Sequence, residues 1–172
     1  MKAAGTALLR RGGTGSVAAP APSSSGKGVA CLRGPAIRTC LYTVGGAVHL
    51  GETAEERILR EVFEETGVRY EIDRPAAVCE NFSAGKDGVL QGLNCHRLEP
   101  YFLMQPKGSR HTCGNSRNMD GDIEDMVWIP VDAMGTCSVR PAFLKEKLKD
   151  ILDGSGVLHV VQDGRQPDMD ET

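Results

Sequence analysis

Short apolar runs bounded by turn residues recur along the chain after residue 39, and each predicts a β-strand. They lie at Cys40–Val44, Ala76–Cys79, Asn94–Met104, Met126–Val131 and Val157–Val161. The first run leads directly into Gly45-Gly46, a dipeptide typical of a tight turn. Residues 105–122 are polar and rich in Gly, Ser, Asn and Arg, which predicts a long loop of the kind that is usually functional or mobile.

A first amphipathic helix is predicted between Thr53 and Gly67. Thr53 and Glu56 have the three-residue spacing of a capping box, which indicates the start of the helix. The helix is expected to run to about Thr66, because Gly67 suits the left-handed conformation that ends many helices. Its apolar residues are expected to dock on the sheet; they are Ile58, Leu59 and Val62.

A second helix is expected to open with Pro141 at its first position, where the missing N–H group costs nothing. Its apolar stripe consists of Phe143, Leu144, Leu148, Ile151 and Leu152. Strands and helices in this order predict a mixed α+β domain without an internal repeat.

Residues 1–40 differ in composition from the rest, since they are rich in Ala, Gly, Ser and Pro. Such a segment buries little apolar surface, so little offsets the entropy lost on ordering. An acid-poor, basic leader resembles an organellar transit peptide, whereas Arg10-Arg11 interrupts the apolar run that a secretory signal requires. A poorly ordered N-terminal portion is favoured over both, with strand-like pieces at Ala3–Leu9 and Gly28–Leu32.

Charge and cysteine content narrow the class of protein. The 172 residues suffice for one domain, and no apolar stretch is long enough to span a membrane. Residues 52–172 carry fourteen basic and 23 acidic side chains, a net charge of −9, which disfavours binding of a nucleic acid polymer. Six cysteines without a CxxC pair indicate neither a disulfide framework nor a zinc ribbon, and a reducing, cytoplasmic location is expected.

The chemistry is expected in the first helix. Glu61, Glu64 and Glu65 have i, i+3, i+4 spacing and are predicted to share one face. Three such carboxylates repel one another unless a cation neutralises them, and Mg²⁺ prefers oxygen ligands. Arg60 is placed to pair with a neighbouring carboxylate, and Glu52 can fold back toward the same cluster. For the helix alone, a solvated acidic face is the simpler interpretation.

The whole segment from residue 46 to residue 68 favours a metal site over a solvated acidic face. It resembles the Nudix box, G-x5-E-x7-R-E-U-x-E-E-x-G-U, in which U is apolar, at every fixed position. The matching residues are Gly46, Glu52, Arg60, Glu61, Val62, Glu64, Glu65, Gly67 and Val68. The chain is therefore identified as a member of the Nudix (MutT-like) hydrolases, with 41–165 as the Nudix domain, 1–40 as an atypical N-terminal portion and 166–172 as a polar tail.

The resemblance implies an α/β/α sandwich in which a mixed sheet carries the box helix on one face and the C-terminal helix on the other. It implies metal-dependent hydrolysis of a diphosphate bond in a nucleoside diphosphate linked to another group. Glu61, Glu64 and Glu65 would bind Mg²⁺ or Mn²⁺, and Arg60, Glu61 and Glu64 would be catalytic. Gly46, Glu52 and Gly67 would support the box.

Several alternatives stay open at this stage. The chain could be a non-catalytic sensor with the same fold, although the complete set of box carboxylates disfavours this, or another enzyme on the fold such as an isoprenoid diphosphate isomerase. An extra carboxylate is expected among Asp120, Asp122, Glu124 and Asp125, without one being singled out. A zinc set built from Cys95, His96, His111 and Cys113 matches no common module. The nucleotide substrate and the oligomeric state, a homodimer included, are undecided.

Overall fold

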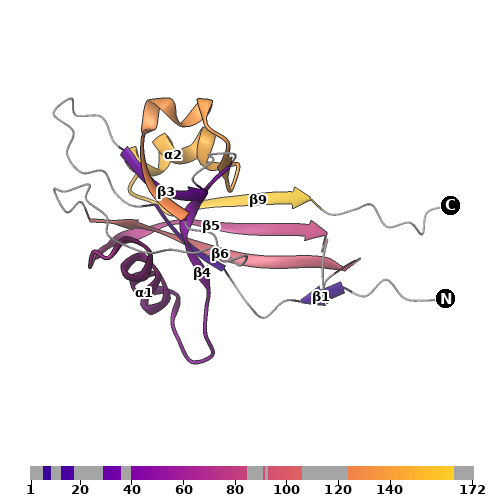
Figure 1. The fold of residues 1–172 in the computed structure, drawn as a ribbon. Coiled ribbons are helices and arrows are strands. Elements are labelled where there is room, and N and C mark those ends of the chain that lie inside the picture. Colours follow the sequence, from indigo (N-terminus) through magenta and orange to yellow (C-terminus); the bar gives the residue numbers. More distant parts are fainter. Residues whose placement is uncertain are drawn as a thin grey trace, which may run out of the picture.

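The computed structural model describes residues 6–8, 13–17, 29–35, 40–84, 91, 93–105 and 124–164 (Figure 1). The strands are β1 (Thr6–Leu8), β2 (Gly13–Val17), β3 (Val29–Pro35), β4 (Leu41–Ala47), β5 (Ile72–Ala84), β6 (Asn94–Met104), β7 (Glu124–Pro130), β8 (Val139–Arg140) and β9 (Leu158–Gly164). The helices are α1 (Ala54–Thr66), the 3-10 helix η2 (Val131–Thr136) and α2 (Leu144–Asp153).

The described strands join in one mixed sheet with the order β7-β3-β4-β2-β6-β5-β9. The longest pairing is antiparallel, between β5 and β6, and β9 adds to the outer side of β5 in parallel. Strands β3 and β4 pair in antiparallel fashion, and β3 also pairs with β7. On this path β4 lies between β3 and β2, which both precede it in the chain, whereas the C-terminal strands β7 and β9 are at the two edges.

The two helices cover opposite faces of this sheet (Figure 1). Alternation along β6 shows why, because successive side chains of a strand point to opposite faces. Tyr101 and Leu103 belong to the core cluster that includes Leu144, Leu148 and Ile151 of α2. Phe102 and Met104 belong to a second cluster together with Ile58 and Val62 of α1. One strand thus anchors both helices.

Local signals predicted several elements well. Helix α1 begins after the Thr53 N-cap, where both hydrogen bonds of the capping box form, and it ends at Gly67 with φ 71°. Strand β6 has the predicted bounds, and β4, β5, β7 and β9 contain or overlap their predicted cores.

Other predictions need correction. Helix α2 starts at Leu144 rather than at Pro141, whose carbonyl accepts a bond from the Leu144 amide in a preceding turn. Leu59 is 37% exposed, so Ile58 and Val62 carry the docking of α1 without it. Strands β2 and β8 and helix η2 were not predicted, because none has a strong local pattern.

The N-terminal portion contributes to the same sheet. Strand β3 lies between β4 and β7, β2 pairs with both β4 and β6, and β1 pairs with β6. The two predicted strand-like pieces overlap β1 and β3. Within the described residues, Ala30, Cys31 and Leu32 of β3 are buried, so this strand is part of the core.

The predicted long loop and the predicted polar tail lie almost entirely outside the residues that the structure describes. The loop 105–122 lies outside the described residues apart from Gln105, as does the tail 166–172. No helix among the described residues is long and apolar enough to cross a membrane.

Candidate active site

The predicted site begins at the end of β4 and continues in the loop that joins β4 to α1; Gly45 and Gly46 lie within β4, so the tight turn predicted at this dipeptide is wrong. Gly45 has φ 144° and Gly51 has φ 87°, conformations that residues with a Cβ rarely adopt. In the loop between β4 and α1, the His49 amide donates to Glu52 Oε2 at 3.0 Å, and the Glu52 amide donates to the His49 carbonyl. Glu52 therefore braces the loop that leads into α1.

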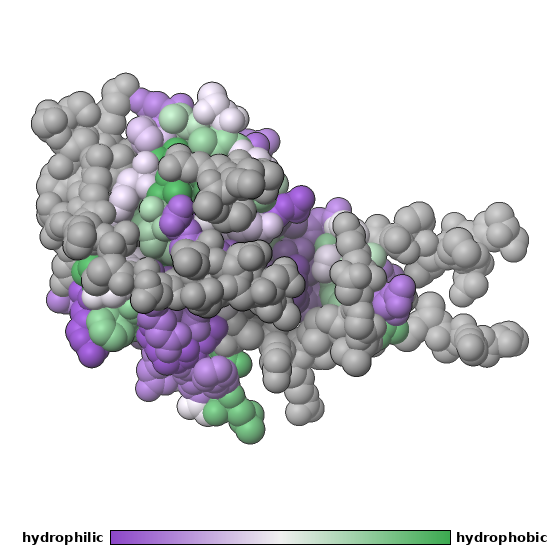
Figure 2. Space-filling model, in the orientation of Figure 1, coloured by the Kyte–Doolittle hydropathy of each residue, from purple (hydrophilic) through white to green (hydrophobic). Residues whose placement is uncertain are grey.

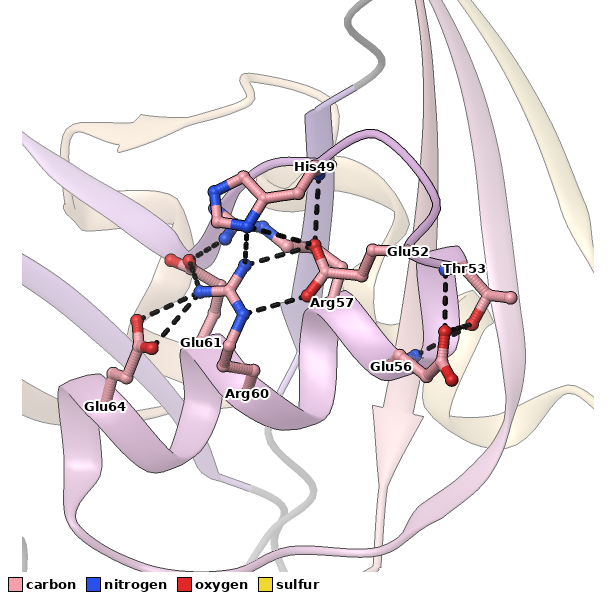
Figure 3. Close-up of polar contacts among 8 residues, drawn as sticks. All are labelled: His49, Glu52, Thr53, Glu56, Arg57, Arg60, Glu61 and Glu64. Carbon is pink, nitrogen blue, oxygen red and sulfur yellow. Dashed lines mark hydrogen bonds and ion pairs between the residues drawn. The ribbon is translucent and has the colours of Figure 1, made fainter.

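Arg60 links the loop to the helix (Figure 3). Its Nε and Nη2 donate to Glu52 Oε1 at 2.8 Å and Oε2 at 3.1 Å, which is a bidentate pair. Its Nη1 donates to Glu61 Oε1 at 2.9 Å and to Glu64 Oε2 at 3.1 Å. One guanidinium thus holds three carboxylates.

These contacts set the charge state of Glu52. The hydrogen bonds from the Arg60 side chain, followed by the His49 amide, lower the pKa of Glu52 to about 2. The same pairing raises the pKa of Arg60 above its ordinary value. Both groups stay charged at neutral pH, so the loop and the helix are tied by a persistent ion pair.

Arg57 lies one helical turn before Glu61 and pairs with it through Nη1 and Oε1. It is 5% exposed, and burial lowers its pKa while the charge of Glu61 opposes that shift. Its guanidinium fills the space beside Gly46, where an added Cβ would overlap Arg57 Nη2 and lie 3.0 Å from Glu61 Oε2. Glycine is therefore needed at position 46, because the side chains of Arg57 and Glu61 occupy the space that a Cβ atom would require.

Glu65 points inward from α1 and meets residues from two distant strands. Arg33 Nη1 of β3 lies 3.2 Å from Glu65 Oε1 and 3.2 Å from Glu124 Oε2 of β7. Burial is the main cause that raises the pKa of Glu65 to about 7, with Arg33 and the Gly45 amide acting against it and Glu61 and Glu124 adding to it. A carboxylate so poised changes its charge near neutral pH.

The three predicted metal carboxylates do not share one environment. Glu64 is turned outward with a side chain 54% exposed, Glu61 is 12% exposed, and Glu65 is 6% exposed. Gly46 lies near the end of β4, Glu52 in the loop before α1, and Gly67 at the C-terminal end of α1. His49 is 70% exposed and lies 3.4 Å from Arg60, at the solvent side of the loop.

Sequence reasoning missed Arg57 and Arg33. The i, i+4 spacing of Arg57 and Glu61 was a local signal that could have found the first. Nothing local could have found Arg33, because its contacts lie on another strand and on the helix. Of the four candidates for an extra carboxylate, Glu124 contacts the Arg33 that holds Glu65, Asp125 is exposed, and Asp120 and Asp122 lie outside the described residues.

The donor set suits a hard divalent cation, since it consists of carboxylate oxygens. Glu65 Oε2 is buried without a hydrogen-bond partner in the described part of the chain, an arrangement that is costly unless a cation or donor approaches it. As the side chains stand, no three described His, Cys, Asp or Glu residues converge on one point, because Arg57 and Arg60 draw the carboxylates toward themselves. A cation would share these oxygens with the arginines or displace them.

The surface over this region is polar. Figure 2 shows hydrophilic side chains gathered over α1, with hydrophobic atoms at the tip of the molecule below it; Leu50 of the loop before α1 is fully exposed. Glu55, Glu56 and Glu64 are exposed members of this helix. The cluster of Glu52, Glu61, Glu64 and Glu65 is therefore open to solvent on the side of Glu64, and β3, β4 and β7 cover it on the side of Glu65.

A family model described as the NUDIX domain matches residues 19–152, more than three quarters of the chain. In sequence, the chain is 29% identical over 86 residues to a protein of Mycobacterium tuberculosis that carries the name mutator protein MutT4. The matched segment is 50% of this chain but 31% of that protein, so the chain spans less than a third of the length of this curated relative.

Solved structures share the fold. A mutator MutT protein from Bacillus halodurans is 15% identical, with a TM-score of 0.63 and 88% of each chain covered. A Nudix hydrolase from M. smegmatis, RenU, is 16% identical with a TM-score of 0.58, over 87% of this chain and 89% of that one. A UDP-X diphosphatase is also 16% identical, with a TM-score of 0.58, over 94% of this chain and 71% of that one. The predicted fold, with a helix on each face of a mixed sheet, is confirmed.

Proposed function

Because this chain belongs to the NUDIX family, we propose that it is a hydrolase that cleaves a diphosphate bond in a nucleoside diphosphate linked to another group. The family prediction made from the box is confirmed by the match over residues 19–152. The metal requirement, the substrate and the roles of single residues belong to the proposal.

The observation that carries the proposal is the arrangement around Arg60. Its guanidinium holds Glu52, Glu61 and Glu64 together within 2.8 to 3.2 Å, although Glu52 comes from the loop and the other two from the helix. A solvated acidic face would not need this link, because exposed carboxylates gain little from fixed ion pairs. The network supports a role for Arg60 in orienting two of the proposed ligands, Glu61 and Glu64, and in linking them to the loop through Glu52.

In the proposed mechanism, Glu61, Glu64 and Glu65 would hold Mg²⁺ or Mn²⁺. When bound, such a cation neutralises phosphate charge and lowers the pKa of a coordinated water. Arg60 keeps Glu61 and Glu64 oriented, and Glu52 fixes Arg60 to the loop. Glu61 or Glu64 accepts a proton from the attacking water while the oxygen of that water bonds to phosphorus. The bridging P–O bond breaks, and a nucleoside monophosphate and a phosphorylated remainder leave.

The substrate is proposed to be a small nucleotide derivative rather than a nucleic acid polymer. The box itself can bind only the diphosphate and the metal, so the base and the leaving group must be recognised by other loops. A cytoplasmic location fits the same proposal, since the described cysteines are free: Cys31, Cys40, Cys79, Cys95 and Cys137.

The test is a release assay on a panel of substrates with Mg²⁺ or Mn²⁺, repeated with EDTA. The panel holds normal and oxidised dNTPs, ADP-ribose, NADH, diadenosine polyphosphates and a nucleotide sugar. We expect turnover of at least one member that EDTA abolishes. No turnover from a folded sample would contradict catalysis and favour the nucleotide sensor, which a binding titration of the same panel would then identify.

A further inference from the structure

Arg57 is a buried cation inside a site that is proposed to bind a second cation. Its side chain is 6% exposed, and its Nε is buried without a hydrogen-bond partner in the described part of the chain. Water cannot solvate this charge, so the pairing with Glu61 is what stabilises it. The box pattern does not specify the residue at this position.

The packing around Arg57 leaves its side chain little free space. Gly46 lies against its guanidinium, with the Arg57 Cζ only 3.2 Å from the point where a Cβ would stand. Arg60 differs, because its side chain is 29% exposed and solvent screens part of its charge. Of the two arginines that share Glu61 Oε1, Arg57 is the one whose charge is shielded from solvent.

A divalent cation at Glu61 would therefore bind close to a buried positive charge. Like charges at such short range in a partly buried site repel strongly, since screening by solvent is weak there. Holding Glu61 in one rotamer helps the cation less than this repulsion harms it, because one side chain loses only modest entropy on ordering.

We propose that Arg57 is a built-in counter-ion of Glu61 that lowers the affinity of the site for a divalent cation. This inference rests on the proposed function, because it takes Glu61 as a ligand. Arg57 acts through Glu61 and is a positioning residue. Its charge stabilises the acidic cluster during folding and is also the reason why the cluster holds its cation weakly.

The experiment measures Mn²⁺ binding to the full chain by electron paramagnetic resonance, without nucleotide. Arg57→Met removes the charge and keeps much of the side-chain volume, and Arg57→Gln removes it but keeps a donor for Glu61. Arg57→Lys keeps the charge. Lys149→Ala is the matched control, because it removes one positive charge from an exposed position of α2, on the opposite face of the sheet. Circular dichroism checks that each variant is folded.

We expect Mn²⁺ to bind about tenfold more tightly to the two neutral variants, with the lysine variant and the control close to the unsubstituted protein. A purely structural role for Arg57 would leave Mn²⁺ affinity unchanged or weaken it. If the unsubstituted protein binds Mn²⁺ and a folded neutral variant binds it no more tightly, this inference alone is overturned. If no variant binds Mn²⁺, the proposed metal-dependent function fails as well; a silent substrate panel would instead leave the Mn²⁺ result standing.

Discussion

Helices α1 and α2 dock on opposite faces of one sheet through similar apolar stripes, but their charged side chains differ in burial and in ion pairing. In α1, Arg57 and Glu65 are buried, 5% and 6% exposed, and each is held by an ion pair. In α2, the Lys147–Asp150 pair is 3.6 Å apart, and its side chains are 47% and 64% exposed. Exposed pairs of this kind contribute little to stability. The difference is that α1 holds buried charges in ion pairs, whereas the Lys147–Asp150 pair of α2 lies at the surface; the proposed function assigns a chemical role to the charges of α1 alone.

Conservative substitution of a carboxylate on each helix gives the largest contrast. Glu64→Gln on α1 should lower kcat on any active substrate by roughly a hundredfold or more, because an oxygen ligand or proton acceptor is lost. Glu146→Gln on α2 should leave kcat unchanged, since Glu146 is exposed on the other face of the sheet. Steady-state kinetics on the best panel substrate measure both. Near-native activity of the first variant would show that Glu64 has no role in the reaction.

Truncation of one core residue per helix should show that the two helices are alike in packing. Ile58 is fully buried under α1 and Ile151 is 3% exposed under α2. Changing either to Ala should lower the free energy of unfolding by about 2–5 kcal/mol, because lost burial and a residual cavity both cost stability.

The Ile58→Ala and Ile151→Ala variants should differ in catalytic activity. Ile58→Ala should also lower kcat, since α1 carries the carboxylates, while Ile151→Ala should keep it in samples that remain folded. Denaturant titration gives the stability, and assays below the unfolding range give the activity. Equal activity losses in the two variants would contradict a division of roles between the helices.

The buried carboxylate Glu65 of α1 predicts that stability depends on pH. The pKa of Glu65 is raised in the folded state to about 7, so between its ordinary value of 4.5 and 7 the folded chain binds more protons there than the unfolded chain. Its contribution to stability is present at low pH and is lost as the pH rises through this range.

Glu65→Gln should remove this dependence, so the stability of the variant relative to the natural protein should increase from pH 5 to pH 7. The expected change is on the order of 2 kcal/mol, measured by urea unfolding with EDTA present. Parallel stability curves for the two proteins would show that Glu65 is already ionised at pH 5.

The smallest effect is expected at the start of α1. Thr53 forms both bonds of a capping box with Glu56, whereas α2 begins after Phe143 without a side-chain cap. Thr53→Ala should cost about 1 kcal/mol of unfolding free energy, and Thr53→Ser should restore most of it. Thermal unfolding of the three proteins measures the difference. Equal melting temperatures would show that tertiary contacts alone hold the helix start.

Phe143 shows how α2 does without such a cap. It is buried and packs edge-on against Tyr101, with ring centroids 5.3 Å apart. Tertiary packing therefore fixes the start of α2, while hydrogen bonds between near neighbours fix the start of α1. This is also why the start of α1 was predicted correctly and that of α2 was placed at Pro141, three residues too early.

Features that depend on close neighbours could be predicted from the sequence: the family through the box, the bounds of α1 through Thr53 and Gly67, and the return of Glu52 toward the carboxylates of α1. Only the tertiary structure decided that the weakly patterned β2 joins β4 and β6, and that Arg33 of β3 meets Glu65 and Glu124. It also decided that Arg57 is buried against Gly46. Helix caps and ion pairs one turn apart follow from local geometry, whereas strand pairing and the burial of a charge depend on which distant segments pack together, and no local pattern encodes that.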